Sequence, residues 1–181
     1  MHEKLYVVPL DEGSRAYSDW LSKELCRKFN LKPQSGISSR LPEEAYNVQQ
    51  NQYYTNPILS KLEMLKGSDF EMILAVTEED LFIPNKNFVM GQANSVSRSA
   101  IVSLHRIKPE LYGLPEDDNL LRSRLLNIAS HEVGHMLGLK NCKNIECQMY
   151  PADTVTELDN RHETFCTECI LNLTLPTKVK I

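Results

Sequence analysis

Two histidines four residues apart, with a glutamate beside the first, are the residues of this chain best suited to metal chemistry. They lie in the segment His131-Glu132-Val133-Gly134-His135. Residues four apart in an α-helix lie about 40° apart around its axis, so both imidazoles would face one zinc ion. Glu132 could take a proton from a zinc-activated water and later pass it to a leaving amine. The segment therefore predicts a zinc-dependent metallopeptidase with Glu132 as general base.

A surface histidine pair with a chance glutamate is the plainer interpretation of these five residues, and the residues that follow weaken it. Gly138 fits the end of a helix, where a left-handed residue turns the chain. That turn would bring position 141, which is occupied by Asn141, back toward the metal.

Four of the five cysteines lie beyond residue 140, in two close groups, and the fifth is Cys26. The four are Cys142, Cys147, Cys166 and Cys169. Such a set favours tetrahedral binding of one structural zinc. Ordinary buried thiols are one alternative, and a pair of disulfides is another that a reducing compartment disfavours. Cys26 falls on an amphipathic helical pattern and is predicted to be a small buried hydrophobe.

Taken together, these residues resemble the archaemetzincin family of metzincin-type zinc metallopeptidases, whose pattern HExxHxxGxxxCxxxxCxM is followed by CxxC. The matching positions are His131, Glu132, His135, Gly138, Cys142, Cys147, Met149, Cys166 and Cys169. The resemblance implies a metzincin-like fold, a third histidine ligand at position 141, and a turn beneath the catalytic metal that contains Met149.

Asn141 departs from that pattern, because its amide oxygen is neutral and weakly basic whereas zinc prefers imidazole, thiolate or carboxylate. A four-ligand zinc site is worth roughly 10–16 kcal/mol, so one lost ligand removes on the order of 3 kcal/mol, about a hundredfold in affinity. The sequence therefore predicts a weakly held catalytic zinc and low activity. The alternative is a catalytically impaired metzincin-like binding or regulatory protein that retains only the structural zinc.

Four further side chains are candidates for the site: His105, Arg106, Tyr150 and His162. His105 and His162 are expected to be surface or internally satisfied histidines rather than ligands. Alternatively, His105 and Arg106 face the cleft, since the resemblance implies that a strand here forms its upper rim, where an extended peptide would pair. Tyr150 is a weaker candidate donor to a developing oxyanion.

The elements that must position these residues follow from hydrophobic periodicity and end signals. The active-site helix is expected to begin near Asp117 and Asp118. Helices between the early strands favour a largely parallel sheet, and the last two strands are close enough for an antiparallel pair. The fold class is thus α/β (α+β), with a metzincin-like mixed twisted sheet. Predicted strands cover 5–8, 70–76, 88–93 and 100–107, predicted helices cover 14–30 and 56–67, and 32–51 is a loop around a short strand near Ile37.

The whole chain fits one metallopeptidase domain of 181 residues, with an N-terminal subdomain over 1–139 and a zinc-stabilised subdomain over 140–181. Its net charge of −4 and the lack of a basic patch argue against a zinc ribbon that binds nucleic acid. No segment is long and apolar enough for a signal peptide or membrane anchor. We therefore expect a cytoplasmic monomer that acts on peptides or small proteins, without nucleic-acid or membrane partners.

Overall fold

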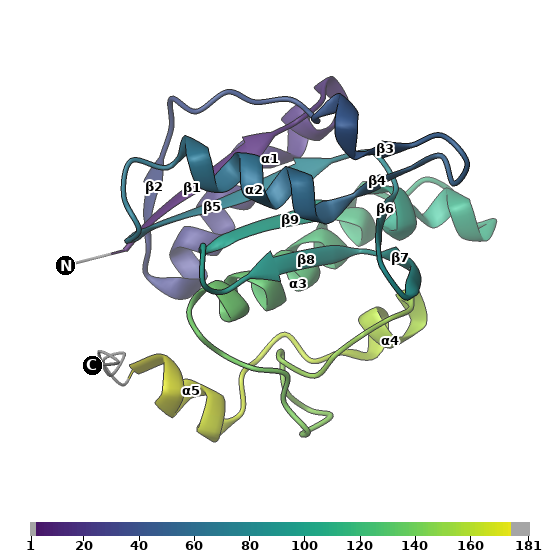
Figure 1. Cartoon of the computed structure of the whole chain (residues 1–181). Coiled ribbons are helices and arrows are strands. Elements are labelled where there is room, and N and C mark those ends of the chain that lie inside the picture. The colour runs from purple at the N-terminus through teal and green to yellow at the C-terminus, as the bar shows by residue number, and fades with distance from the viewer. Residues whose placement is uncertain (1–2, 175–181) are drawn as a thin grey trace.

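The computed structural model describes residues 3–174, which form two β-sheets and five α-helices (Figure 1). The larger sheet has five strands in the order β2-β1-β5-β9-β8. These strands are β1 (Lys4–Pro9), β2 (Lys32–Gln34), β5 (Glu71–Thr77), β8 (Gly91–Asn94) and β9 (Ser99–Ser103). All neighbours in this sheet run parallel except β8, which is antiparallel to β9. The predicted fold class and mixed sheet are confirmed.

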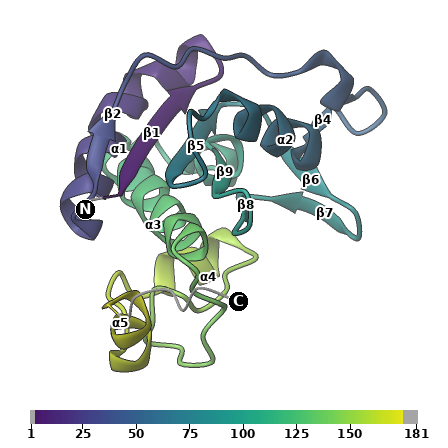
Figure 2. The same ribbon diagram turned by 60° about the vertical axis from the view of Figure 1, so that its left-hand side comes forward.

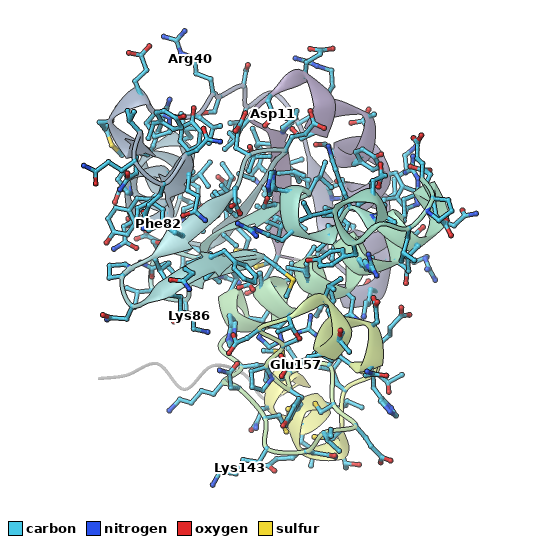
Figure 3. The ribbon with its side chains drawn as sticks, turned by 90° about the vertical axis from the view of Figure 1, so that its right-hand side faces the viewer. Asp11, Arg40, Phe82, Lys86, Lys143 and Glu157 are labelled. Atoms are coloured by element: carbon cyan, nitrogen blue, oxygen red, sulfur yellow. The ribbon has the colours of Figure 1, made fainter. Side chains whose placement is uncertain are left out.

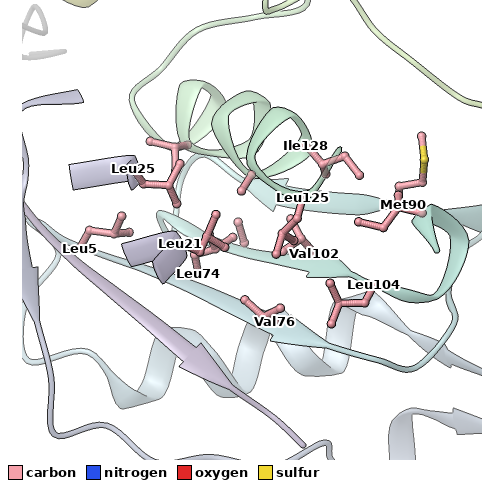
Figure 4. Packing of buried hydrophobic residues seen from close by; sticks show 14 of the residues in the cluster. Leu5, Leu21, Leu25, Leu74, Val76, Met90, Val102, Leu104, Leu125 and Ile128 are labelled. Carbon is pink, nitrogen blue, oxygen red and sulfur yellow. The ribbon is translucent and has the colours of Figure 1, made fainter. Parts of the chain in front are cut away.

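Helices cover both faces of the large sheet. The five helices are α1 (Glu12–Phe29), α2 (Thr55–Leu65), α3 (Asp118–Met136), α4 (Val155–Asn160) and α5 (Thr167–Thr174), of which α1, α2 and α3 lie on the sheet. α1 and α3 lie on one face, where Leu21 and Leu25 meet Leu125 and Ile128 in the larger core (Figure 4). α2 packs on the opposite face. Because both faces are covered, β5 is buried along its whole length.

Side-chain caps explain where the two long helices begin. The Asp11 carboxylate accepts the backbone N–H of Ser14, and the Ser14 hydroxyl accepts the N–H of Asp11, which closes a capping box at the start of α1. Asp117 caps α3 in the same way by accepting the N–H of Leu120 at 3.0 Å. The start of the active-site helix is therefore where the sequence places it.

The smaller sheet was not predicted. Its four strands are β3 (Tyr46–Asn47), β4 (Gln52–Tyr54), β6 (Leu81–Ile83) and β7 (Lys86–Val89). The prediction of one strand over 88–93 is wrong, because the chain passes from β7 to β8, and so from one sheet to the other, at Met90. The apolar run Phe88-Val89-Met90 continues across this bend, so hydrophobicity along the chain does not reveal it.

Two other predicted strands need correction. The 32–51 segment contains two short strands, β2 and β3, and neither lies at Ile37. The strand predicted over 100–107 ends at Ser103, and His105–Ile107 forms a 3₁₀ helix instead. The Ser103 hydroxyl accepts the N–H of His105 at 3.0 Å, a local bond that turns the chain out of the sheet.

Beyond α3 the chain forms a small C-terminal part with α4, α5 and long irregular segments, beneath the sheet and its helices (Figure 2). Phe165 ties this part to α1, because its ring lies 5.6 Å from that of Phe29 and 5.7 Å from the Lys28 ammonium. Between residues 3 and 174, no helix is both long and apolar enough to cross a membrane.

Candidate active site and metal centre

The active-site helix α3 brings His131 and His135 together at the edge of a cleft. Leu125, Ala129 and Val133 pack into the core, which turns the opposite face of the helix outward. The two imidazole rings lie 4.6 Å apart between centroids, and their Nε2 atoms are 3.0 Å apart. The one-turn spacing thus places both rings as the sequence predicts.

The other ring nitrogen of each histidine is tied to a backbone carbonyl. Nδ1 of His131 lies 3.0 Å from the Gln148 oxygen, and Nδ1 of His135 lies 2.8 Å from the Leu139 oxygen. A carbonyl only accepts, so these contacts favour a proton on each Nδ1, although Nη1 of Arg161 also lies 3.1 Å from Nδ1 of His131. With the protons on Nδ1, both Nε2 lone pairs face the same space. Two lone pairs at 3.0 Å repel each other unless a cation lies between them.

This arrangement fits zinc. Zinc–nitrogen bonds of 2.0–2.1 Å in tetrahedral geometry separate two ligand nitrogens by roughly 3.3 Å. The observed Nε2 separation of 3.0 Å is within a few tenths of an ångström of that value. Burial also lowers the pKa of His131 to about 3, helped by the nearby Arg161 charge, so its ring stays neutral and able to bind a metal.

Asn141 reaches the same space through the turn that ends α3. Gly138 has φ 93°, and the N–H groups of Gly138 and Leu139 bond the carbonyls of His135 and Gly134 in a Schellman motif. The chain then doubles back, so that Asn141 lines the cleft with both histidines, near enough for its side chain to act to raise the pKa of His131. The structure therefore brings His131, His135 and Asn141 together.

Glu132 lies in the same cleft and is only 7% exposed. Burial raises the pKa of its carboxyl to about 8, while the positive charge of Arg161 acts in the opposite direction. The same burial lowers the pKa of the Arg161 guanidinium to about 10, which the Glu132 charge partly offsets. A carboxylate in this environment is a stronger base than one in water.

The cleft is a cavity of about 480 Å³ between the end of the large sheet and the C-terminal part. Its upper wall includes Phe88 and Gln92, and its lower wall includes Pro151. The Lys86 ammonium, at the tip of the β6–β7 hairpin above the C-terminal part (Figure 3), lies 2.5 Å from the Asp153 carboxylate. This ion pair bridges the two walls at one end of the cleft.

β8 forms the upper rim, and it pairs only with β9 among the described strands. The Ser103 N–H donates to the Met90 carbonyl at 2.9 Å, so Met90 and every second residue after it in β8 are hydrogen-bonded to β9. The backbone groups of Gly91 and Ala93 consequently point away from β9 toward the free edge, where an extended peptide could pair. The expectation that His105 and Arg106 face the cleft is wrong: neither lines it, and Arg106 bonds Asp80 instead.

Gly91 touches the active-site helix so closely that a side chain would not fit. A methyl group there would meet Cγ2 of Ile128 at 2.9 Å and Oε1 of Glu132 at 3.0 Å. We predict that Gly91→Ala displaces the Glu132 carboxylate, lowers kcat at least tenfold and destabilises the fold by about 1–3 kcal/mol. Gly67→Ala, whose methyl would approach Glu71 away from the cleft, is the control. An unchanged kcat in Gly91→Ala would contradict the prediction, because the added methyl would then not displace the Glu132 carboxylate from its working position.

The four C-terminal cysteines form the second candidate metal site. Their Sγ atoms all lie within 4.8 Å of one another: Cys142, Cys147, Cys166 and Cys169. The Cys142–Cys166 sulfur distance of 3.8 Å matches the value of about 3.8 Å expected for tetrahedral zinc with 2.3 Å bonds. The cluster could therefore hold a structural zinc, as predicted. Cys26 lies apart from it and is buried in the larger core, as also predicted.

The remaining candidate residues, Met149, Tyr150 and His162, do not line the cleft. Met149 is fully buried, and only the absence of a side chain at Gly134, between the two histidines in the chain, lets its sulfur approach α3 so closely. His162 is exposed, which agrees with its expected surface role. The Tyr150 side chain does not line the cleft, so the structure gives no support to its role as an oxyanion donor.

Sequence reasoning missed three buried polar residues behind His131: Asn127, Gln148 and Arg161. Asn127 lies on α3, one turn before His131, and its residue type and spacing alone predict no role for it. Neither Gln148 nor Arg161 belongs to a recognisable sequence motif. Gln148 lies between Cys147 and Met149, and Arg161 follows α4. Only their position inside the cysteine-bounded segment could have drawn attention to them.

Comparisons with known proteins agree with this site. The model of Peptidase family M54 matches residues 10–175. An archaemetzincin of Pyrococcus furiosus is 33% identical over 96% of this chain and 93% of its own length. The crystal structure of a zinc-dependent peptidase from Methanocorpusculum labreanum has TM-score 0.83 and 30% identity, covering 93% of this chain and 99% of that chain. An archaemetzincin structure from Methanopyrus kandleri has TM-score 0.81 and 30% identity, covering 95% and 93%.

The fold, the paired histidines and the cysteine cluster thus agree with the family match, and the resemblance noted in the sequence is confirmed. The family and its relatives support a zinc-dependent metallopeptidase, which hydrolyses peptide bonds. The chain belongs to peptidase family M54, the family of the archaemetzincins.

Proposed function

We propose that His131, His135 and Asn141 hold the zinc of this peptidase, and that Glu132 is its general base. The observation that carries this proposal is the Nε2 separation of 3.0 Å between two histidines whose Nδ1 protons are directed to carbonyls. Nitrogen lone pairs that converge in this way are a prepared cation site. The third position is the weakest of the set, because Asn141 offers a neutral amide oxygen.

Each residue around the cleft then has a defined task. When bound, zinc supplies a Lewis acid that polarises the peptide carbonyl and lowers the pKa of water. Glu132 takes a proton from the attacking water and gives it to the leaving amine. The free edge of β8 at Gly91 and Ala93 holds the peptide backbone in extended form. Burial around Glu132 limits competing solvent and strengthens its basicity.

Asn141 is the reason to propose a low activity. The amide supplies less charge to the metal than the imidazole that the metzincin pattern has at this position. Asn141→His should therefore tighten metal binding at the histidine site by about a hundredfold, on the order of 3 kcal/mol.

The experiment is a zinc competition titration, against a chelator of known affinity, of the wild type, Asn141→His and the double variant His131→Ala/His135→Ala. We expect two zinc ions per chain in the first two proteins, with the weaker one tightened by Asn141→His. The double variant should keep only the cysteine-bound zinc. Equal affinity in wild type and Asn141→His would show that position 141 does not face the metal. A wild type that binds one zinc, unchanged in the double variant, would favour the impaired binding protein.

We also propose the wider setting of this activity. The cleft is open enough for peptides or small proteins, and the net charge of −4 with a sequence pI near 5.8 does not suit a nucleic-acid partner. Free thiols in the cysteine cluster suit a reducing compartment such as the cytoplasm. We propose one monomeric domain with subdomains over 1–139 and 140–181.

A further inference from the structure

Behind the histidine that begins the motif, a buried arginine makes contacts that the peptidase mechanism does not require. Arg161 follows α4 and is 7% exposed. Among the described residues, no carboxylate lies within salt-bridge distance of its guanidinium. Burying a charge without such a partner is costly, so the surrounding structure must hold it for a reason other than a simple ion pair.

The guanidinium uses its whole planar fork on neutral acceptors. Nε donates to Oδ1 of Asn127 at 2.8 Å, and Nη2 donates to the Asn127 carbonyl at 3.1 Å. Nη1 donates to the Tyr150 carbonyl at 3.3 Å and lies 3.1 Å from Nδ1 of His131. Arg161 therefore joins α3, one turn before His131, to the turn that contains Met149.

Gln148 joins the same two segments from the other side. Its side-chain Nε2 donates to Oδ1 of Asn127 at 2.8 Å and to the Asn127 carbonyl at 3.0 Å. Its Oε1 accepts from the Lys28 ammonium at 2.9 Å, and the residue is fully buried. The Gln148 backbone carbonyl is the acceptor for Nδ1 of His131. Asn127 thus holds both residues that fix the position of that carbonyl.

The position of the Gln148 carbonyl affects which nitrogen of His131 carries the proton. Nδ1 has two neighbours, the Gln148 carbonyl at 3.0 Å and Nη1 of Arg161 at 3.1 Å. With the proton on Nδ1, the ring donates to Gln148 and Nε2 is free for a metal. With Nδ1 bare, the ring would accept from Arg161, and the proton on Nε2 would block the metal. The two neighbours of Nδ1 thus favour opposite tautomers, and only the one directed to the Gln148 carbonyl leaves Nε2 free for a metal.

We propose that Arg161 is a positioning residue for the catalytic metal: through Asn127 and the Tyr150 carbonyl it fixes the turn whose Gln148 carbonyl orients His131. The inference rests on the proposed histidine site. The planar shape of the guanidinium, and not its charge alone, fixes the turn that contains the Gln148 carbonyl. A lysine keeps the charge but offers no planar set of donors, so Arg161→Lys should lose most of the effect.

Arg124 supplies a matched control. It lies on α3 and, like Arg161, is buried, with 4% of its surface exposed. Its fork binds the Asp159 carboxylate at 2.8 and 2.6 Å and the Ile107 carbonyl, away from His131. Arg124→Lys should perturb folding as much as Arg161→Lys without altering the metal site. Gln148→Met keeps the side-chain volume and removes the tether to Asn127, so it tests the same turn independently if Arg161→Lys does not fold.

The test is the Co²⁺ affinity of the histidine site, measured by chelator competition in folded protein whose cysteine site is already filled. The d–d spectrum of the bound ion reports its ligand geometry. We expect Arg161→Lys and Gln148→Met to weaken binding about 10–100-fold and to alter the spectrum, with Arg124→Lys within twofold of wild type. Nitrogen-15 spectra of the metal-free histidine site should show His131 losing its dominant Nδ1–H tautomer in the first two variants only.

Two results would overturn the inference. One is wild-type affinity and spectrum in whichever of Arg161→Lys and Gln148→Met folds. The other is an equal loss in Arg124→Lys, which would indicate general loosening of α3. Failure of the proposed function can be told apart from failure of this inference, because the wild type itself would then bind no metal at the histidines.

Discussion

Glu132→Gln is expected to lower kcat for peptide hydrolysis by 10²–10⁴-fold while the protein keeps its fold and both metal ions. The amide has the size of the carboxyl group but cannot accept the proton of the attacking water. Glu132 is buried and lies in the cleft with the histidines, whereas the other carboxylate that lines the cleft, Asp153, is exposed and paired with Lys86 at one end of it. Zinc content and circular dichroism, measured with kcat, separate loss of the base from loss of the site.

Glu24→Gln is the control, because Glu24 pairs with Arg27 on the outer face of α1, outside the cleft. Its kcat should equal that of the wild type. Retention of at least half of wild-type kcat in zinc-loaded Glu132→Gln would remove Glu132 from the proton transfer.

Cys147→Ser is expected to empty the cysteine site and, as a consequence, to weaken the catalytic site. Cys147 is fully buried, and its sulfur accepts the N–H groups of Met149 and Cys166, both at 3.4 Å. A serine hydroxyl is a poor ligand for a zinc site worth roughly 10–16 kcal/mol. The buried apolar cluster of the C-terminal part is small, since it consists of Leu139, Met149 and two of the cysteines.

The second effect follows from the order of residues in the chain. Gln148, whose carbonyl orients His131, comes directly after Cys147, and Asn141 comes directly before Cys142. Cys147→Ser should therefore lose zinc from both sites and become sensitive to limited proteolysis beyond α3. Cys26→Ala, in the larger core, should cost about 1 kcal/mol and no zinc. A Cys147→Ser protein with two zinc ions and unchanged protease resistance would contradict this linkage.

The features that the sequence predicted well are those fixed by local chemistry. The spacing of His131 and His135 determines their shared face, Asp117 determines where α3 starts, and Gly138 determines where the chain turns back. The four cysteines also meet as their grouping indicates. In each case a short stretch of chain contains enough information, because helix geometry and ligand preference act over a few residues.

The features that the sequence did not predict depend on contacts between distant segments. The bend at Met90 and the second sheet arise from pairing of β4 with β6, which no local period encodes. The contact of Arg161 with Asn127 joins residues 34 positions apart, and that of Lys28 with Gln148 joins residues 120 apart. Polar residues of this kind look like solvent-exposed positions until the fold buries them together.

The central claim is that His131 and His135 share one divalent ion beside Glu132, and an anomalous-scattering map at the zinc edge tests it most directly. Crystals grown with zinc should show two peaks per chain. One should lie about 2.0–2.1 Å from both Nε2 atoms, with the Asn141 side chain turned toward it, and the other about 2.3 Å from the four cysteine sulfurs. A single peak at the sulfurs, with the histidine rings turned apart, would contradict the account.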